Sequence, residues 1–568
     1  GDEAGTAITT GDNNVCIGYQ AGDAISVGDN NIAIGKNALG AEDGHDFNIA
    51  IGSNALAAQD AGADAYNIAI GHNAGTSITS GVQNTLIGGQ AGDAITDADF
   101  NVGVGHNALS VNVLGSQSVA IGHNALLFQN PASATDMANV AVGYGAGSQI
   151  TTGVQNTILG GSAGDALTTG NENVAIGMEA LTSDTQGKRS VAVGKSALLT
   201  QNLSSSANAY NTAVGYDSGR SVTTGVNNII IGALAGDALT DADFNVAVGF
   251  QALTNDTLGS GSTAIGHHAL QTQNFSSATN SLNVAVGYQA GKGVTTGIAN
   301  TLVGNQAGDA LTGGNNNIAI GHDALGAEIQ GDKNVAVGVG ALQSQSNSSS
   351  TDTENTAVGY NAGLNHTTGT LNVCVGAEAG KGITTGGGNT IVGHSGGTRN
   401  TDLSTGNNNT LIGRETGTSA TGASNNNVLG KDVVGSGEDT FTFGISTSDS
   451  AIASGGTSIS APSDERYKEE IETSTAGLSF INDLRPVTFR WKKEKDLPSD
   501  HRAYVKDSEK RTMNAKHNHG FVAQEVKKVI DAHPELKDGF NMWQADARDG
   551  RQRVAPAELI PIFTKAIQ

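Results

Sequence analysis

Four residues near the C-terminus have side chains that could break a peptide bond: Ser463, Asp464, Arg466 and Lys468. A serine hydroxyl is a weak nucleophile until a nearby base takes its proton. A lysine amine is such a base only when burial or a neighbouring cation lowers its pKa. Arg466 is a candidate for that cation, and Asp464 for orienting the group. The same residues also suit a loop that starts a helix, with Ser463 or Asp464 as the cap, so the spacing alone leaves both interpretations open.

A second group of polar residues follows about fifty positions later, where the run from His519 to Glu525 reads His-Gly-Phe-Val-Ala-Gln-Glu. His519 could polarise a carbonyl or support the loop around it. Gln524 and Glu525 are further candidates for a supporting role.

Other residue types suggest ligands only weakly. Histidines are close in sequence at 267–268 and 517–519, but scattered histidines on a polar surface usually face solvent, so we predict no metal site. No glycine-rich turn opens a helix after a strand in a βαβ unit, and no cofactor is predicted. Four aspartates recur every 72 residues, and we expect them to cap turns, with calcium binding or paired-carboxylate glycosidase chemistry as the alternatives. They are Asp93, Asp165, Asp237 and Asp309.

The C-terminal segment should be a small α+β domain. The sequence predicts a helix over 478–484, an alternating strand over 485–491 and a final helix over 557–563. Four apolar residues of that final helix should share one face: Leu559, Ile560, Phe563 and Ile567.

Nearly all of the preceding chain is a repeat. A pentad of Asn, a β-branched residue, a usually small residue, a β-branched residue and Gly occurs in 24 copies between Asn14 and Asn427, with Ser in place of the opening Asn at Ser118, Ser190 and Ser262. The usual step is 17 residues, with occasional steps of 21, and four steps make a period of 72. A fixed period of this kind is the signature of a solenoid. We interpret the copy at Asn427 as lacking one residue.

One circuit should contain two short strands and two turns, and stacked circuits would pair in parallel about 4.8 Å apart. The opening Asn can bond to neighbouring backbone or stack on the Asn of the next circuit. A 17-residue circuit should be too thin to enclose a core alone, so we expect several chains to share one core. Cys16 and Cys374 replace the small residue and should form no disulfide.

Composition changes abruptly near residue 462. Six of the seven prolines and both tryptophans lie at or beyond Pro462. We therefore predict four parts: a lead-in over 1–13, a shaft over 14–430, a cap, tip strand and linker over 431–462, and a C-terminal domain over 463–568. The shaft is strongly acidic, which argues against nucleic-acid binding, and no apolar run is long enough to insert into a membrane.

The Asn-x-Ala-Ile-Gly pattern resembles the head repeats of trimeric autotransporter adhesins, in which three chains pack around one axis as a parallel β-roll. The resemblance implies a mainly β, trimeric β-solenoid shaft. An adhesin would also need a C-terminal membrane anchor, and we expect none here.

The two C-terminal motifs, in this order, resemble the self-cleaving intramolecular chaperone at the end of phage endosialidases, tailspikes and tail fibres. That resemblance implies Ser463 as nucleophile, Lys468 as base, and a cut between Pro462 and Ser463 after the domain has trimerised the chain and helped the shaft to fold.

The leading prediction is a homotrimeric phage tail fibre, made in the host cytoplasm and located in the virion. Its partners would be a host cell-surface receptor, either a glycan or an outer-membrane component, and other tail proteins through an N-terminal region. A tailspike depolymerase of surface polysaccharide and a bacterial surface adhesin are the alternatives.

Overall fold

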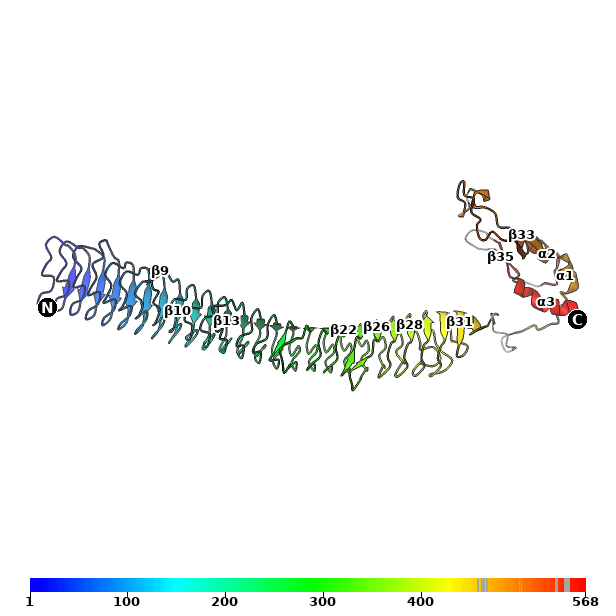
Figure 1. The fold of residues 1–568 in the computed structure, drawn as a ribbon, viewed down its shortest axis with the longest axis horizontal. Helices are drawn as coiled ribbons and strands as arrows, with labels where there is room; N and C mark the ends of the chain where they lie inside the picture. The colour runs from blue at the N-terminus through cyan, green and yellow to red at the C-terminus, as the bar shows by residue number, and fades with distance from the viewer. Residues whose placement is uncertain are drawn as a thin grey trace. The chain divides into compact units, whose positions relative to one another are not determined.

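The protein is described by a computed structural model covering residues 1–456, 459–460, 465, 468–499, 501, 503–536, 540–545 and 552–568. The chain divides into two compact units, Gly1–Pro462 and Ser463–Gln568, which are described separately. Unit 1 is a stack of turns, coloured blue to yellow in Figure 1, and unit 2 is a small α+β body.

Unit 1 is a parallel β-solenoid, as the repeat predicts. Each turn gives one short strand to a continuous sheet, and each strand pairs with the strand of the next turn in register, for example Val284 with Thr301. The pairing is parallel throughout until a final antiparallel pair, β31 with β32. The strands of this sheet are β1 Val15–Ile17, β2 Ile32–Ile34, β3 Ile49–Ile51, β4 Ile68–Ile70, β5 Thr85–Ile87, β6 Val102–Val104, β8 Val119–Ile121, β10 Val140–Val142, β11 Thr157–Leu159, β12 Val174–Ile176, β13 Val191–Val193, β14 Thr212–Val214, β15 Ile229–Ile231, β16 Val246–Val248, β18 Thr263–Ile265, β20 Val284–Val286, β21 Thr301–Val303, β22 Ile318–Ile320, β24 Val335–Val337, β26 Thr356–Val358, β27 Val373–Val375, β28 Thr390–Val392, β29 Thr410–Ile412, β30 Asn427–Lys431, β31 Thr440–Ile445 and β32 Ser448–Ala453.

One chain encloses its own core, so the expectation that several chains must share it is wrong. Counting the opening Asn as position 1, the residue at position 3 points inward and is buried in almost every turn; it is Ala in most turns and Leu or Ile in several others. The remaining space is filled in two alternative ways. Most turns with Gly at position 9, such as Gly291, have an aliphatic residue at position 12, such as Val294. Turns with Leu at position 9, such as Leu325, have a polar residue there, such as Glu328. With either choice, the inward side chains of the turns form a buried core within one chain.

The circuit has one regular strand, not two. Its second side is made of tight turns in which positions 7 and 9 adopt positive φ, as in Gln289 (56°) and Leu325 (56°). These backbones cannot form an extended strand, but they still bond to the next turn, as from Gly291 N to Ala307 O at 2.9 Å. Two-residue strands occur here only beside the longer insertions: β7 Gly115–Ser116 with β9 Thr135–Asp136, β17 Gly259–Ser260 with β19 Thr279–Asn280, and β23 Gly331–Asp332 with β25 Thr351–Asp352.

A ladder of buried asparagines ties each turn to its neighbours, as predicted for position 1. The side-chain oxygen of Asn228 accepts a bond from the amide of Asn245 at 3.0 Å. Its side-chain nitrogen donates to Ala242 O at 2.8 Å and to Asn211 Oδ1 at 3.2 Å. The same pattern recurs along the shaft, so a side chain satisfies backbone groups that the turn would otherwise bury unpaired.

The fourth turn of each 72-residue period modifies this ladder. In three periods a serine replaces the asparagine, and a buried glutamine at position 12 reaches the next asparagine, as when Asn211 Nδ2 donates to Gln201 Oε1 at 2.9 Å. The recurring aspartates act structurally as well: Asp165 and Asp237 accept the hydroxyls of Thr182 and Thr254 one turn later.

The end of the shaft differs from the sequence interpretation in one respect. Asn426, not Asn427, is the ladder residue, since its amide donates to Asn409 Oδ1 at 2.9 Å. The pentad is therefore complete, with Asn427 at position 2 facing outward. Asn427 then pairs with Phe441 in β31, and β32 folds back along β31 as a cap. Cys16 and Cys374 are free, and burial raises the pKa of the Cys374 thiol to about 12.

Unit 2 has a small core beneath three helices, built around Phe480, Val526, Met542, Leu559 and Ile562. The predicted final helix is present, but its buried side is not the predicted apolar face. Leu559 and Ile562 point inward, while Ile560, Phe563 and Ile567 are exposed. The elements are α1 Leu478–Asp483, β33 Val487–Phe489, η2 Glu494–Asp496, β34 Asn518–Gly520, α2 Ala523–Ala532, β35 Trp543–Ala545, β36 Gln552–Val554, η3 Pro556–Glu558 and α3 Leu559–Ile567.

The asparagine ladder predicts a local cost of removal. In Asn228→Ala the amide of Asn245 and the carbonyl of Ala242 lose their partner, at about 1–3 kcal/mol for each buried group left unsatisfied. Hydrogen exchange of the Asn245 amide should therefore accelerate, while exposed Asn255→Ala should leave it unchanged. Equal protection in the two variants would contradict a structural role for the ladder.

Candidate functional site

The structure describes only some of the residues predicted to do chemistry. Ser463, Asp464, Arg466 and the bond from Pro462 to Ser463 lie outside the described residues. Lys468 is described: it is exposed, and its backbone amide donates to Glu465 O at 3.0 Å. The proposed nucleophile and base therefore remain a prediction.

His519 lies on β34, which pairs antiparallel with β33 and places it opposite Thr488. The Thr488 hydroxyl is 3.5 Å from His519 Nδ1. Beside this pair is a pocket of about 880 Å³, lined in part by Phe489, Trp491, His519, Gln524 and Arg553. His519 and Gln524, which the sequence placed in supporting roles, thus line one pocket.

Glu525 is held at the start of α2 by an ion pair with Arg485. Arg485 Nε donates to Glu525 Oε2 at 2.9 Å, and a second bond joins Arg485 Nη2 to Glu525 Oε1. Hydrogen bonding to Arg485 lowers the pKa of the Glu525 carboxyl. A negative charge in the first turn also suits the helix dipole. Glu525 therefore orders the start of α2, next to the pocket that Gln524 lines.

Sequence reasoning assigned no site role to two further pocket residues, Trp491 and Arg553. Trp491 was predicted only as part of a strand. Arg553 belongs to no motif in the sequence, and it lines the pocket because the fold brings β36 next to β34 and the start of α2. The sequence shows Arg485 as a cation at the start of the predicted strand. It does not show that Arg485 pairs with Glu525, forty residues later.

His533 joins two helices of unit 2. It follows α2, and its Nε2 lies 2.8 Å from Asp483 Oδ2 at the end of α1, while its Nδ1 lies 2.6 Å from Glu535 Oε1. The edge of Phe480 packs against the imidazole, with ring centroids 5.3 Å apart. Hydrogen bonds to Glu535 and Asp483 raise the pKa of His533. Its charged form therefore clamps α1 to the end of α2.

Comparison with known proteins bears on this unit. Residues 463–534 match the family described as the chaperone of endosialidase. Unit 2 carries a chaperone-of-endosialidase domain. Together with the parallel β-solenoid, this domain fits a phage tail fibre or tailspike-type protein with a C-terminal intramolecular chaperone. No curated protein and no solved structure matches the chain.

None of the helices in the described residues has the length and apolarity needed to cross a lipid bilayer.

The His533 clamp predicts a pH dependence of chaperone-domain stability. Because the folded-state pKa of His533 is raised, its contribution is complete below the ordinary histidine pKa and is lost as pH rises through the folded value. The difference in melting temperature between the native chain and His533→Gln should be present at pH 6 and shrink toward pH 9. Both tryptophans lie in unit 2, so their fluorescence reports this transition.

His517→Gln is the matched control, because the side-chain hydrogen bond of His517 in the described residues joins its Nδ1 to Arg490 Nη2 at 3.4 Å and involves no carboxylate. A His533→Gln difference that stays constant across this pH range would refute the clamp.

Proposed function

We propose that the protein is the shaft of a phage tail fibre, assembled as a homotrimer, and that its chaperone domain aligns three chains and then cuts itself off before Ser463. The observation that carries the proposal is the match to the chaperone family, which begins at the residue where the compact solenoid unit gives way to the second unit.

The homotrimer is supported by an apolar face on the shaft. Positions 2 and 4 of the pentads point outward and carry Val, Ile, Thr or Leu in every turn but that of Asn426, and no charged residue occupies them. Ile229 and Ile231 are 44% and 39% exposed within one chain. Larger side chains flank the strands on both sides, including Phe244 at 63% and Tyr288 at 51%.

This apolar face extends along the 24 turns that carry a pentad, spaced about 4.8 Å, roughly 115 Å in all. Soluble monomers rarely expose continuous apolar patches of more than a few hundred Å². We assign the face to two further copies of the chain, packed around a three-fold axis. The inside of each solenoid is closed already, so trimerisation covers this outer face and leaves the cores separate.

A shaft of this kind needs an external device to set its register. Each turn offers its neighbour nearly the same parallel pairing, so displaced alignments between chains keep many contacts. Pairing between distant parts of separate chains is also slow to nucleate. A globular domain at one end sets the alignment there, from which the shaft can grow.

The cut would proceed by an acyl shift. Ser463 Oγ attacks the carbonyl carbon of Pro462 while Lys468 takes the hydroxyl proton. The C–N bond breaks, the leaving Ser463 amine receives a proton from Lys468, and Pro462 is left esterified to Ser463 Oγ. Water then hydrolyses the ester, giving a Pro462 carboxylate and restoring the serine hydroxyl. His519 and Gln524, beside the pocket, would support the reacting segment.

After this step the solenoid, capped by β31 and β32, would remain in the virion and bind a host-surface glycan or outer-membrane component. Attachment to other tail proteins would use an N-terminal region.

Trimerisation can be tested on the apolar face. In Ile231→Asp, a carboxylate placed at the three-fold interface would lose its hydration, so sedimentation should show the trimer replaced by monomer or its dissociation constant raised more than tenfold. Asn255→Asp, on an exposed turn, should sediment as the native protein does. A native chain that sediments as a monomer would end the proposal.

Self-cutting can be tested by the mass of the expressed chain. The native protein should yield two fragments that meet at Pro462 and Ser463, whereas Ser463→Ala should stay intact. Lys468→Ala should slow the cut on the order of 10²–10⁴-fold, as removal of a general base does. Two fragments from Ser463→Ala as well would show that Ser463 is not the nucleophile, and an uncut native chain would contradict self-cutting.

A further inference from the structure

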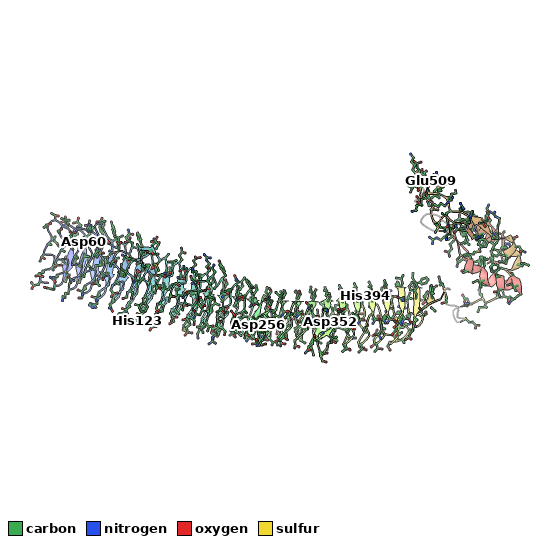
Figure 2. All side chains as sticks on the ribbon, in the orientation of Figure 1. Asp60, His123, Asp256, Asp352, His394 and Glu509 are labelled. Atoms are coloured by element: carbon green, nitrogen blue, oxygen red, sulfur yellow. The ribbon has the colours of Figure 1, made fainter. Side chains whose placement is uncertain are left out.

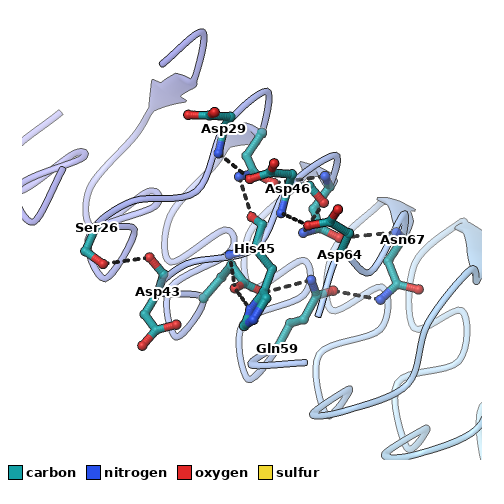
Figure 3. Close-up of polar contacts among 11 residues, drawn as sticks. Ser26, Asp29, Asp43, His45, Asp46, Gln59, Asp64 and Asn67 are labelled. Carbon is teal, nitrogen blue, oxygen red and sulfur yellow. Dashed lines mark hydrogen bonds and ion pairs between the residues drawn. The ribbon is translucent and has the colours of Figure 1, made fainter. Parts of the chain in front are cut away.

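The strongest unassigned cluster of metal-ligating side chains lies near the start of the shaft. Glu42, Asp43, His45 and Asp60 come from two successive turns, and one potential ligand atom from each lies within 4.8 Å of the others. Figure 3 shows this part of the solenoid, with Asp43 and His45 on one turn and Gln59 on the next. Asp60, labelled in Figure 2, follows Gln59 directly.

The solenoid itself supplies a comparison, because four later periods repeat the same corner. Position 15, occupied by His45, is Gly in all four: Gly115, Gly187, Gly259 and Gly331. Position 13, occupied by Asp43, is Val113, Thr185, Thr257 and Ile329, and the place of Asp60 is taken by Asn130, Asn202, Asn274 and Ser346. Three metal-ligating residues therefore coincide at one corner where the equivalent corners of the later periods have none of them.

In two of the later periods, a hydrogen bond between neutral side chains occupies the place of Asp43 and Asp60. Thr185 Oγ1 donates to Asn202 Oδ1 at 3.0 Å, and Thr257 Oγ1 donates to Asn274 Oδ1 at 3.0 Å. In the first period both neutral partners become carboxylates, so the bond is lost and two like charges face each other across the same contact. Within the described residues, the ion pair of this cluster is internal and joins His45 to Glu42. No lysine or arginine there forms an ion pair with any of the four residues.

Glu42 is buried and fixed in place by hydrogen bonds. Its Oε1 accepts from the His45 amide at 3.0 Å and lies 2.7 Å from His45 Nδ1. Its Oε2 accepts from Gln59 Nε2 at 3.1 Å, and Gln59 Oε1 in turn accepts from Asn67 of the ladder at 2.9 Å, a relay visible in Figure 3. Such outer hydrogen bonds are what fix metal-ligating carboxylates in known sites.

We propose that these four residues bind one divalent transition-metal ion, with three carboxylate oxygens and one imidazole nitrogen as ligands. Zn²⁺ and Mn²⁺ suit this donor set and bind at about 2.0–2.2 Å, which places ligand atoms no more than about 4.4 Å apart. The ion offsets the repulsion between Asp43 and Asp60. It also clamps two turns where the spacing changes, since the step from Asn48 to Asn67 is 19 residues instead of 17.

The test converts the first corner to the sequence of a later one, which keeps a backbone that the solenoid already adopts. The full chain is titrated with Zn²⁺ by calorimetry, and the experiment is repeated with Asp43→Thr/Asp60→Asn and with His45→Gly. We expect one ion per native chain and an affinity at least tenfold weaker in each variant. Asp241→Asn, another exposed acid of the shaft, should bind as the native chain does.

A structural readout separates this corner from adventitious binding elsewhere on the acidic shaft. Zn²⁺ should slow hydrogen exchange of amides in residues 42–60 of the native chain and not in the double variant. The proposal is overturned if the native chain binds no ion, if the variants bind it equally well, or if Ca²⁺ binds as tightly as Zn²⁺ and His45→Gly leaves that affinity unchanged. None of these results depends on trimerisation or self-cutting.

Discussion

The shaft depends on satisfying backbone groups at its corners without a second sheet. A 17-residue turn has room for one three-residue strand, and the rest of its backbone bends too tightly for strand pairing. The buried asparagine at position 1 resolves this problem, because its amide both accepts and donates and so bonds to two turns at once. An apolar residue of similar size would fill the space but leave an amide and a carbonyl buried without partners.

The packing of the interior depends on positions 9 and 12, whose side chains share one space inside the turn. Where position 9 is glycine, the side chain at position 12 fills the corner; where position 9 is leucine, position 12 becomes polar and joins the hydrogen-bond network. A Cβ on Gly147 would come within 3.1 Å of both Ile150 Cδ1 and Leu126 Cδ2, which shows how fully the neighbours occupy that space. His366 is an exception, a buried histidine at position 12 whose pKa burial lowers to about 4.

The period, the parallel stacking and the asparagine ladder could be predicted because each is written as a spacing or a residue type. The closed core could not, since it depends on how position 9 and position 12 share one volume across turns. In unit 2 the order of motifs predicted the family, and the elements near 478–491 and 559–567 followed from hydrophobic patterns. The pocket beside His519 could not be predicted, because Trp491 and Arg553 meet only through the fold. The cluster at Glu42 could not be predicted either, because its members lie on two different turns. Comparison with the later periods then shows that the equivalent corners lack Asp43, His45 and Asp60.

The 72-residue period has a consequence for how three such chains would align. In most periods the outward residue after the pentad glycine is small in one turn and larger in the other three, as in Ala233 followed by Phe250, His267 and Tyr288. The rings stack along the shaft, with Phe250 and Tyr288 each within 5.4 Å of His267. If all turns were identical, chains displaced by one turn, about 4.8 Å, would match perfectly. With four classes of turn, the smallest displacement that restores the match is four turns, about 19 Å. In such a trimer the four classes of turn would disfavour displacements of one to three turns, and the displacements left for the chaperone domain to exclude would be those of four turns or more.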